Sequence, residues 1–170
     1  MSYMSTYNLR APVMAALNPA LTYIEVLTVP PPTGWGDTGK VWEFRIGGKV
    51  SLKGQGALLR RELYFGDTRL TQLFTYRTGN DGDYFFDDTH LMPSYMDNLS
   101  ALFSKSASAI DKISGQEGTP ISTTAGIGTV TQVVSSLTID PAANIRYIVS
   151  YDGGSTVQPV TLGYFTVHEL

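Results

Sequence analysis

Hydrophobic and polar residues alternate along much of this chain, which is the pattern of half-buried β-strands. In residues 41–52, "VWEFRIGGKVSL", the apolar Trp42, Phe44 and Ile46 alternate with Glu43 and Arg45. Further strand-like segments, rich in β-branched and aromatic residues, occupy 20–29, 57–65, 69–77, 128–140, 144–151 and 156–170. Gly- and Pro-rich turns separate them, so the pattern predicts about eight strands.

One segment departs from this alternation. In residues 93–114 apolar side chains recur at three- and four-residue steps, with Ser94 as a candidate N-cap and Gly115 as a stop signal. This spacing predicts an amphipathic helix in a connection between strands. Residues 78–86, "TGNDGDYFF", have Asp81-Gly82 at their centre and are typical of a hairpin tip.

These elements predict a mainly β fold, a single jelly-roll or β-sandwich barrel with one helix. Strand number alone leaves an immunoglobulin-like sandwich open as well, and the helix favours the jelly roll. No repeat or linker divides the chain of 170 residues. We therefore expect an N-terminal arm at residues 1–19 and one domain at 20–170.

The charge content points to surfaces that meet protein. Charged residues make up 16% of the chain, against about 25% in ordinary domains, and interfaces are depleted in Lys, Glu and Asp. The net charge of −3 and the pI of about 5.2 provide no basic patch for nucleic acid. The pair Arg60-Arg61 is followed by Glu62, which indicates a solvated strand face. There is no Cys, which excludes disulfides and thiolate chemistry.

Residues 34–41, "GWGDTGKV", contain two catalytic signatures in overlap. Gly34, Gly39 and Lys40 have the spacing of a phosphate-binding loop, but prolines precede them and a strand pattern follows, where that loop requires a helix. Asp37-Thr38-Gly39 spells the aspartic-protease motif, without the apolar neighbours that bury its aspartate. We interpret the segment as a connection with an exposed Trp35 at its tip, and as a contact loop with Trp35, Asp37 and Lys40.

Other candidate sites are weaker. The aspartates Asp81, Asp83, Asp87 and Asp88 leave a surface calcium site open, although the EF-hand spacing fails. His90 and His168 are too few and too distant for a histidine-rich metal centre. The carboxylates of Glu25, Glu43 and Glu62 are expected to point outward into solvent. We therefore predict no catalytic residue, no metal and no cofactor.

The aromatic residues allow a different function. Trp35, Trp42, Tyr64, Tyr84 and Tyr95 could form a platform on which sugars stack, although core and interface packing accounts for most aromatic residues.

As a pattern over its whole length, the chain resembles viral capsid proteins of the single jelly-roll type. The segments that carry this resemblance are "ALTYIEVLTV", "VWEFRIGGKV", "GTVTQVVSSLTID" and "TLGYFTVHEL". The size and composition look closest to the smaller major capsid protein of tailless, membrane-containing icosahedral phages of thermophilic bacteria.

This resemblance implies a shell building block located in the virion. Such a subunit forms at least a dimer, packs beside a second capsid protein and lies close to an internal viral membrane, without binding nucleic acid directly. The alternative is a β-sandwich binding module, such as a phage tail, receptor-binding or carbohydrate-binding domain.

Overall fold

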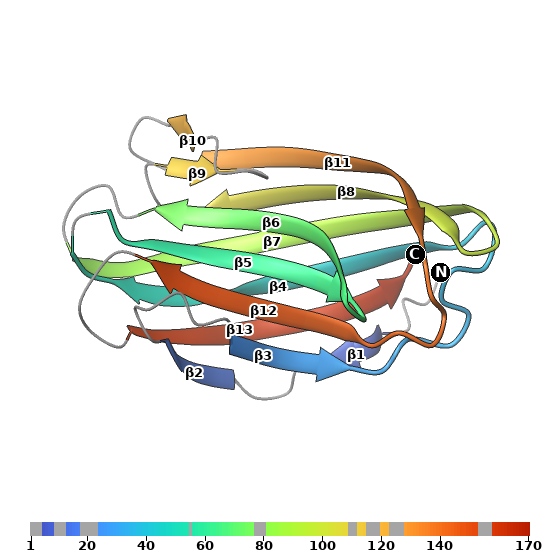
Figure 1. Ribbon diagram of the computed structural model, residues 1–170, viewed down its shortest axis with the longest axis horizontal. Helices are drawn as coiled ribbons and strands as arrows, with labels where there is room; N and C mark the ends of the chain where they lie inside the picture. Colours follow the sequence, from blue (N-terminus) through green and yellow to red (C-terminus); the bar gives the residue numbers. More distant parts are fainter. Residues whose placement is uncertain are drawn as a thin grey trace.

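The protein is a β-sandwich of two antiparallel sheets, which confirms the predicted mainly β fold (Figure 1). Its computed structural model describes residues 5–8, 13–17, 24–54, 56–76, 81–108, 112–114, 120–122, 128–152 and 158–170. Sheet A has the strand order β1-β13-β4-β7-β8-β11, with β2 also paired to β13, and sheet B has the order β10-β9-β6-β5-β12-β3.

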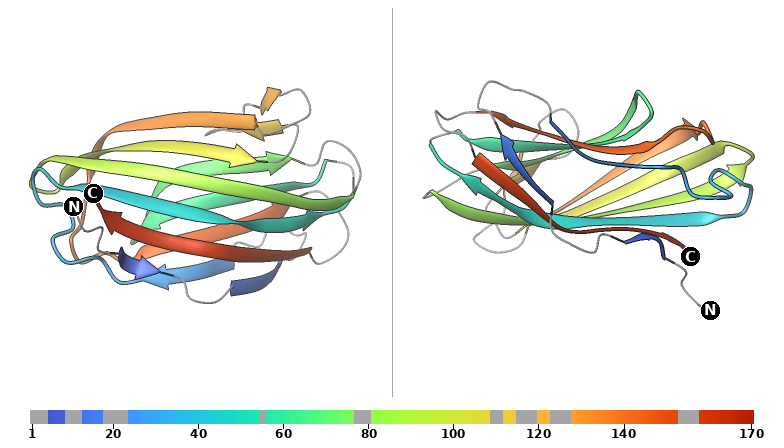
Figure 2. Two further views of the ribbon diagram at one scale, coloured as in Figure 1. Left: turned by 180° about the vertical axis from the view of Figure 1, so that it is seen from behind. Right: turned by 90° about the horizontal axis from the view of Figure 1, so that it is seen from below.

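The strands follow one another along the chain with these bounds: β1 Ser5–Asn8, β2 Val13–Leu17, β3 Ile24–Val29, β4 Val41–Leu52, β5 Leu58–Phe65, β6 Thr68–Tyr76, β7 Gly82–Met96, β8 Leu99–Ser108, β9 Lys112–Ser114, β10 Pro120–Ser122, β11 Gly128–Thr138, β12 Ile145–Asp152 and β13 Gln158–Glu169. The chain passes repeatedly between the sheets, so that β3 and β12 pair in sheet B while β4 and β13 pair in sheet A. Figure 2 shows sheet A from behind and the two layers from below.

The core lies between the sheets, where β4, β5, β12 and β13 place apolar side chains. On β4 the side chains of Trp42, Phe44 and Ile46 are almost completely buried, while Arg45 between them is exposed. The alternation read from the sequence thus places one face of β4 in the core and the other outside. Burial of each such side chain contributes about 1.5–3 kcal/mol.

A bulge in β13 shapes the outer face of sheet A. The register between β13 and β4 shifts between Leu162 and Tyr164, opposite Gly47 and Gly48. A Cβ at Gly47 would lie 2.1 Å from ring atom Cζ of Tyr164. Gly47 is therefore needed because the Tyr164 ring occupies the space where a side chain would stand.

The predicted helix at 93–114 is wrong over the described residues. Residues up to Met96 complete β7, Asp97 and Asn98 form a turn, and β8 runs from Leu99 to Ser108. Asn98 has a φ of 60°, a left-handed conformation that Asn adopts more readily than most residues. Leu91 and Phe103 are cross-strand partners. The apolar residues that suggested a helix therefore belong to the two strands of a hairpin.

The predicted hairpin tip at 78–86 is also wrong, because β6 lies in sheet B and β7 in sheet A. Residues 5–8 and 13–17 of the predicted N-terminal arm pair with β13. Within the described part of the chain there is no helix of the length and apolarity needed to cross a membrane.

Candidate functional site

The segment 32–40 is a series of three tight turns. The amides of Trp35, Asp37 and Lys40 donate to the carbonyl three residues earlier, at 3.2, 3.1 and 3.3 Å. The third residue of each turn is a glycine, with φ of 80° at Gly34, 85° at Gly36 and 81° at Gly39. A positive φ at that position is what a type II turn requires. The glycine spacing that suggested a phosphate-binding loop therefore arises from turn geometry, and β4 rather than a helix follows it.

Trp35 is not exposed, contrary to the prediction. Only 2% of its surface is accessible, and its ring centroid lies 4.5 Å from that of Phe65, 5.5 Å from Phe44 and 6.1 Å from Trp42. The turns fold the indole back into the core, where edge-on aromatic contacts hold it. Trp35 therefore anchors the segment and is not available as a contact residue.

Asp37 and Lys40 do lie at the surface of this segment. Asp37 is exposed in a turn, whereas the aspartic-protease arrangement needs a buried pair of carboxylates. Lys40 forms an ion pair with Glu169 at 3.1 Å. Backbone hydrogen bonds attach the segment to the β7–β8 turn, from Asn98 N to Gly36 O and from Gly39 N to Ser94 O, both 2.9 Å long.

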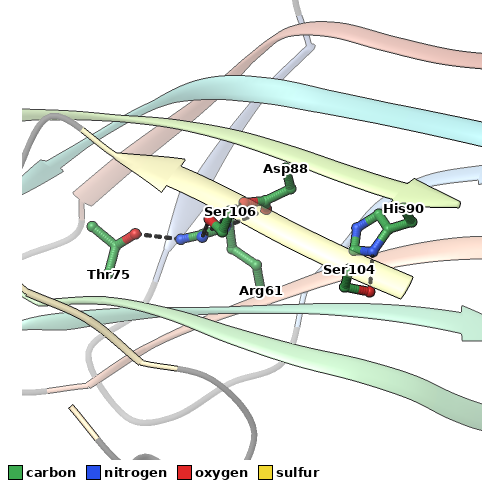
Figure 3. A network of polar contacts seen from close by, with 6 residues as sticks. All are labelled: Arg61, Thr75, Asp88, His90, Ser104 and Ser106. Carbon is green, nitrogen blue, oxygen red and sulfur yellow. Dashed lines mark hydrogen bonds and ion pairs between the residues drawn. The ribbon is translucent and has the colours of Figure 1, made fainter. Parts of the chain in front are cut away.

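A polar cluster bridges the two sheets inside the sandwich (Figure 3). Arg61 of β5 reaches across to Asp88 of β7, with Nε 2.7 Å from Oδ2 and Nη2 3.1 Å from Oδ1. Arg61 also donates to Thr75 and Ser106, and Ser106 donates to Asp88. Both charged side chains are 1% exposed. The predicted solvated face at Arg60-Arg61 is therefore wrong for Arg61.

Two further groups are perturbed by this cluster. Burial lowers the pKa of His90 to about 4, although the Asp88 carboxylate opposes the shift, and His90 Nδ1 lies 2.6 Å from Ser104 Oγ. Burial, reinforced by Asp88, raises the pKa of Tyr147 well above its ordinary value. Burial acts to lower the pKa of Arg61, but the charge of Asp88 and its hydrogen bond, together with Tyr147, raise it on balance. The cluster therefore holds one compensated ion pair with a neutral imidazole nearby.

The aspartates considered for calcium do not converge. Asp88 faces the core, whereas Asp83 and Asp87 on the other face of β7 pair with Lys49 and Arg45. Asp81 accepts a hydrogen bond from Gly54 N at 2.9 Å. Among the described residues, no three His, Cys, Asp or Glu side chains are grouped closely enough to hold a metal ion.

The outer face of sheet B carries a hydrogen-bonded polar network. Glu62 is only 1% exposed, contrary to the prediction of a solvated carboxylate. It accepts hydrogen bonds from Arg69 at 3.2 Å, Gln72 at 2.5 Å and Tyr64 at 3.1 Å. Arg146 lies 5.6 Å from the Tyr64 ring centroid and pairs with Glu25 at 2.6 Å. These side chains largely satisfy one another.

The aromatic residues predicted as a sugar platform are dispersed. Trp35 and Trp42 are in the core, Tyr84 packs partly buried against it, Tyr64 belongs to sheet B and Tyr95 is exposed at the end of β7. They do not form a single surface.

An apolar strip lies on the outer face of sheet A, near the turn that joins β7 to β8. It consists of Leu91, Pro93, Tyr95, Met96, Ala101 and Phe103. Leu91 and Phe103 are cross-strand partners. Tyr95 and Met96 are each 58% exposed and Phe103 is 39% exposed. Large apolar side chains gathered in this way on a soluble surface are typical of contact sites.

A groove of about 710 Å³ lies beside the apolar strip, over β4 and β13. Its lining residues are Glu43, Arg45, Tyr164, Thr166, His168 and Leu170. Glu43 and His168 are direct cross-strand partners, and so are Arg45 and Thr166. The residues therefore form consecutive outward-facing rungs of one ladder. Arg45 Cζ lies 6.0 Å from the Tyr164 ring centroid.

Sequence reasoning missed this groove. Period-two alternation does identify Glu43 and Arg45 as outward residues of β4, and it could have done the same for Thr166 and His168 of β13. The pairing of β4 with β13, more than a hundred residues later, has no local signal, because neither segment encodes which strand lies beside it.

No family model and no curated protein matches the chain. Among solved structures, peanut lectin with a nine-residue peptide has a TM-score of 0.42 and 8% identity, over 100% of this chain and 98% of that one. The CBM2 module of the evolved Dit of Lactobacillus casei BL23 phage J-1 has a TM-score of 0.36 and 9% identity, over 83% and 66%. Infectious bursal disease virus, Gx strain, has a TM-score of 0.33 and 14% identity, over 100% of this chain but 42% of that one. With scores this low, these similarities do not assign a function.

Proposed function

We propose that the protein is a structural subunit of a virion shell, which associates with itself and packs beside other shell subunits. The observation that carries this proposal is the apolar strip on the outer face of sheet A, where Tyr95, Met96 and Phe103 are exposed together. A chain with only 16% charged residues is suited to a surface that contacts protein over large areas. In this proposal the protein has no catalytic role.

The two outer faces differ in a way that supports this role. Sheet B carries paired charges at its surface, Arg69 with the buried Glu62 and Arg146 with Glu25, and the exposed members of these pairs suit contact with water. Sheet A has the apolar strip. A subunit with one polar and one apolar outer face can pack side by side with neighbours through the second while the first remains solvated. A second shell protein and a nearby internal membrane are the partners we expect.

Self-association tests the proposal directly. We expect sedimentation velocity to show dimers or larger species of the purified protein, and Phe103→Lys to shift them to monomer because the charge would have to be desolvated in the contact. Thr68→Lys introduces the same charge at an exposed position of β6 in sheet B and should leave association unchanged. A strict monomer at high concentration, or equal behaviour of both variants, would contradict the strip as the interface. Electron microscopy of the purified protein and mass spectrometry of a parent particle would test its place in a shell.

A second candidate function is that of a binding module, and the groove over β4 and β13 is the observation that favours it. The groove and the apolar strip lie on different strands, so that one subunit could serve both purposes.

A further inference from the structure

We propose that the groove over β4 and β13 is a binding site for a neutral saccharide. The inference rests on the groove alone and does not require the protein to be a shell subunit. The volume of about 710 Å³ falls within the range of small-molecule sites. Outward side chains two residues apart on a strand are about 6.7 Å apart, so the rungs from Glu43 to Gly47 offer the length of one or two sugar rings.

The polar groups of the groove are partly paired, because Arg45 forms an ion pair with Asp87. No described residue forms an ion pair with Glu43, and Nδ1 of His168 is buried without a hydrogen-bond partner. Thr166 adds a hydroxyl on the next rung, opposite Arg45. The His168 Nδ1 atom is shielded from solvent, so the Glu43 carboxylate is the acceptor that a ligand in the groove can reach. Hydrogen-bond donors and acceptors thus lie close together on β4 and β13.

Tyr164 supplies an aromatic surface in a fixed position. The bulge of β13 presents it outward, Gly47 leaves room beneath its ring, and Arg45 lies beside it. Burial and the neighbouring Asp87 carboxylate raise the pKa of Tyr164, so its hydroxyl remains protonated at neutral pH. The C–H faces of a sugar ring pack on such an aromatic ring, while its hydroxyls reach the polar groups around it.

The chemistry of the groove argues against other ligands. Arg45 is already paired with Asp87, so the groove has no excess positive charge to select an anion, and no three potential metal ligands are grouped there among the described residues. An apolar ligand would remove water from Glu43 and His168 without replacing their hydrogen bonds. A peptide could not extend the sheet here, because β13 is already paired on both sides at residues 166–168, with β4 and with β1. A polyhydroxyl ligand satisfies both the donors and the acceptors.

The test is an NMR titration of the isotopically labelled protein with the methyl glycosides of glucose, galactose, mannose and N-acetylglucosamine, each up to about 20 mM, a range that detects dissociation constants on the order of 1 mM. We expect at least one glycoside to shift the amide signals of residues 43–47 and 164–168. Tyr164→Ala should weaken binding about tenfold through loss of the ring contact. Glu43→Gln should weaken it several-fold while retaining the size of the side chain.

Phe103→Lys is the matched control, because it changes an aromatic residue on the same face outside the groove. Its binding should equal that of the wild type, and its altered self-association separates this test from that of the shell proposal. If Tyr164→Ala does not fold, the glycoside affinity of Glu43→Gln alone tests the inference. The inference is overturned if no glycoside shifts the groove signals, if shifts occur only elsewhere, or if Glu43→Gln binds as the wild type does.

Discussion

The ion pair between Arg61 and Asp88 should affect stability most when only one of its two side chains is removed. Both side chains are 1% exposed, so removing one leaves the other as an uncompensated charge in the core. In Asp88→Leu, Arg61 keeps the hydroxyls of Thr75 and Ser106 and the Phe86 ring, whose centroid lies 4.5 Å from its Cζ, but no described carboxylate, as partners. Loss of one member of a buried pair costs about 3–5 kcal/mol of the free energy of unfolding. For a chain of this length that lowers Tm by roughly 10 °C.

The double variant Arg61→Met with Asp88→Leu should lose less stability than the two single variants added together. Both charges are then absent, and apolar side chains of similar volume fill the space, a replacement that is often neutral or stabilising. The hydroxyls of Thr75 and Ser106 remain in the core, and leaving them unsatisfied costs about 1–3 kcal/mol each. These costs make the recovery partial, and the expected signature is a coupling energy of at least about 2 kcal/mol between the two sites.

Urea unfolding followed by tryptophan fluorescence measures these differences, because Trp35 and Trp42 are both buried in the core. The matched control is Asp87→Leu, one residue along β7. Asp87 pairs with Arg45 at the surface, where the side chains are 44% and 49% exposed, and such pairs contribute about 0–1 kcal/mol. The reasoning is refuted if Asp88→Leu costs no more than the control, or if the double variant loses the sum of the two single effects.

Two further predictions concern the core. Because burial lowers the pKa of His90 to about 4, His90 binds a proton below about pH 6.5 in the unfolded chain but not in the folded protein. Stability should therefore be complete above about pH 6.5 and fall by about 2 kcal/mol between pH 7 and pH 5. Urea titrations at both pH values should show a smaller fall in the free energy of unfolding in His90→Gln. An equal fall in this variant would contradict the assignment of the effect to His90. Trp35→Ala should cost about 3–5 kcal/mol, as large core deletions do, whereas Asp37→Ala in the same turns should cost less than about 1 kcal/mol. Equal effects of these two changes in thermal unfolding would count against Trp35 as the anchor.

The contrast between β4 and β8 shows how far the sequence can predict this fold. On β4 the apolar residues face the core, so alternation gave the strand, its bounds and its buried face. On β8 the inward residues Ser100, Ser104 and Ser106 are polar and buried. Phe103 points outward instead. Ser106 bonds to Asp88, Ser104 to His90 and Ser100 to Ser94, so polar partners on β7 account for the inverted pattern on that strand.

Arg61 illustrates the same difficulty from the opposite sheet. A pair of arginines in a strand ordinarily faces solvent. No residue near Arg61 in the sequence indicates that its partner is Asp88, 27 residues away. The predicted contact loop failed for a related reason. Three glycine turns reverse the chain so tightly that Trp35 points back into the core, and the direction of a side chain after several turns depends on dihedral angles that composition does not reveal.

The pairing of the first long strands with the last ones has a consequence for synthesis. Sheet A is completed only when β13 lies between β4 and β1, and sheet B only when β12 lies between β5 and β3. A ribosome adds about 5–20 residues per second, so β4 is outside the exit tunnel for seconds before its second partner, β13, exists, although its first partner β7 follows sooner. Topologies dominated by such distant pairings fold in milliseconds to seconds. The nascent chain must therefore keep the apolar face of β4 from aggregating until its final residues emerge, and a chaperone that binds alternating apolar segments would serve it during that interval.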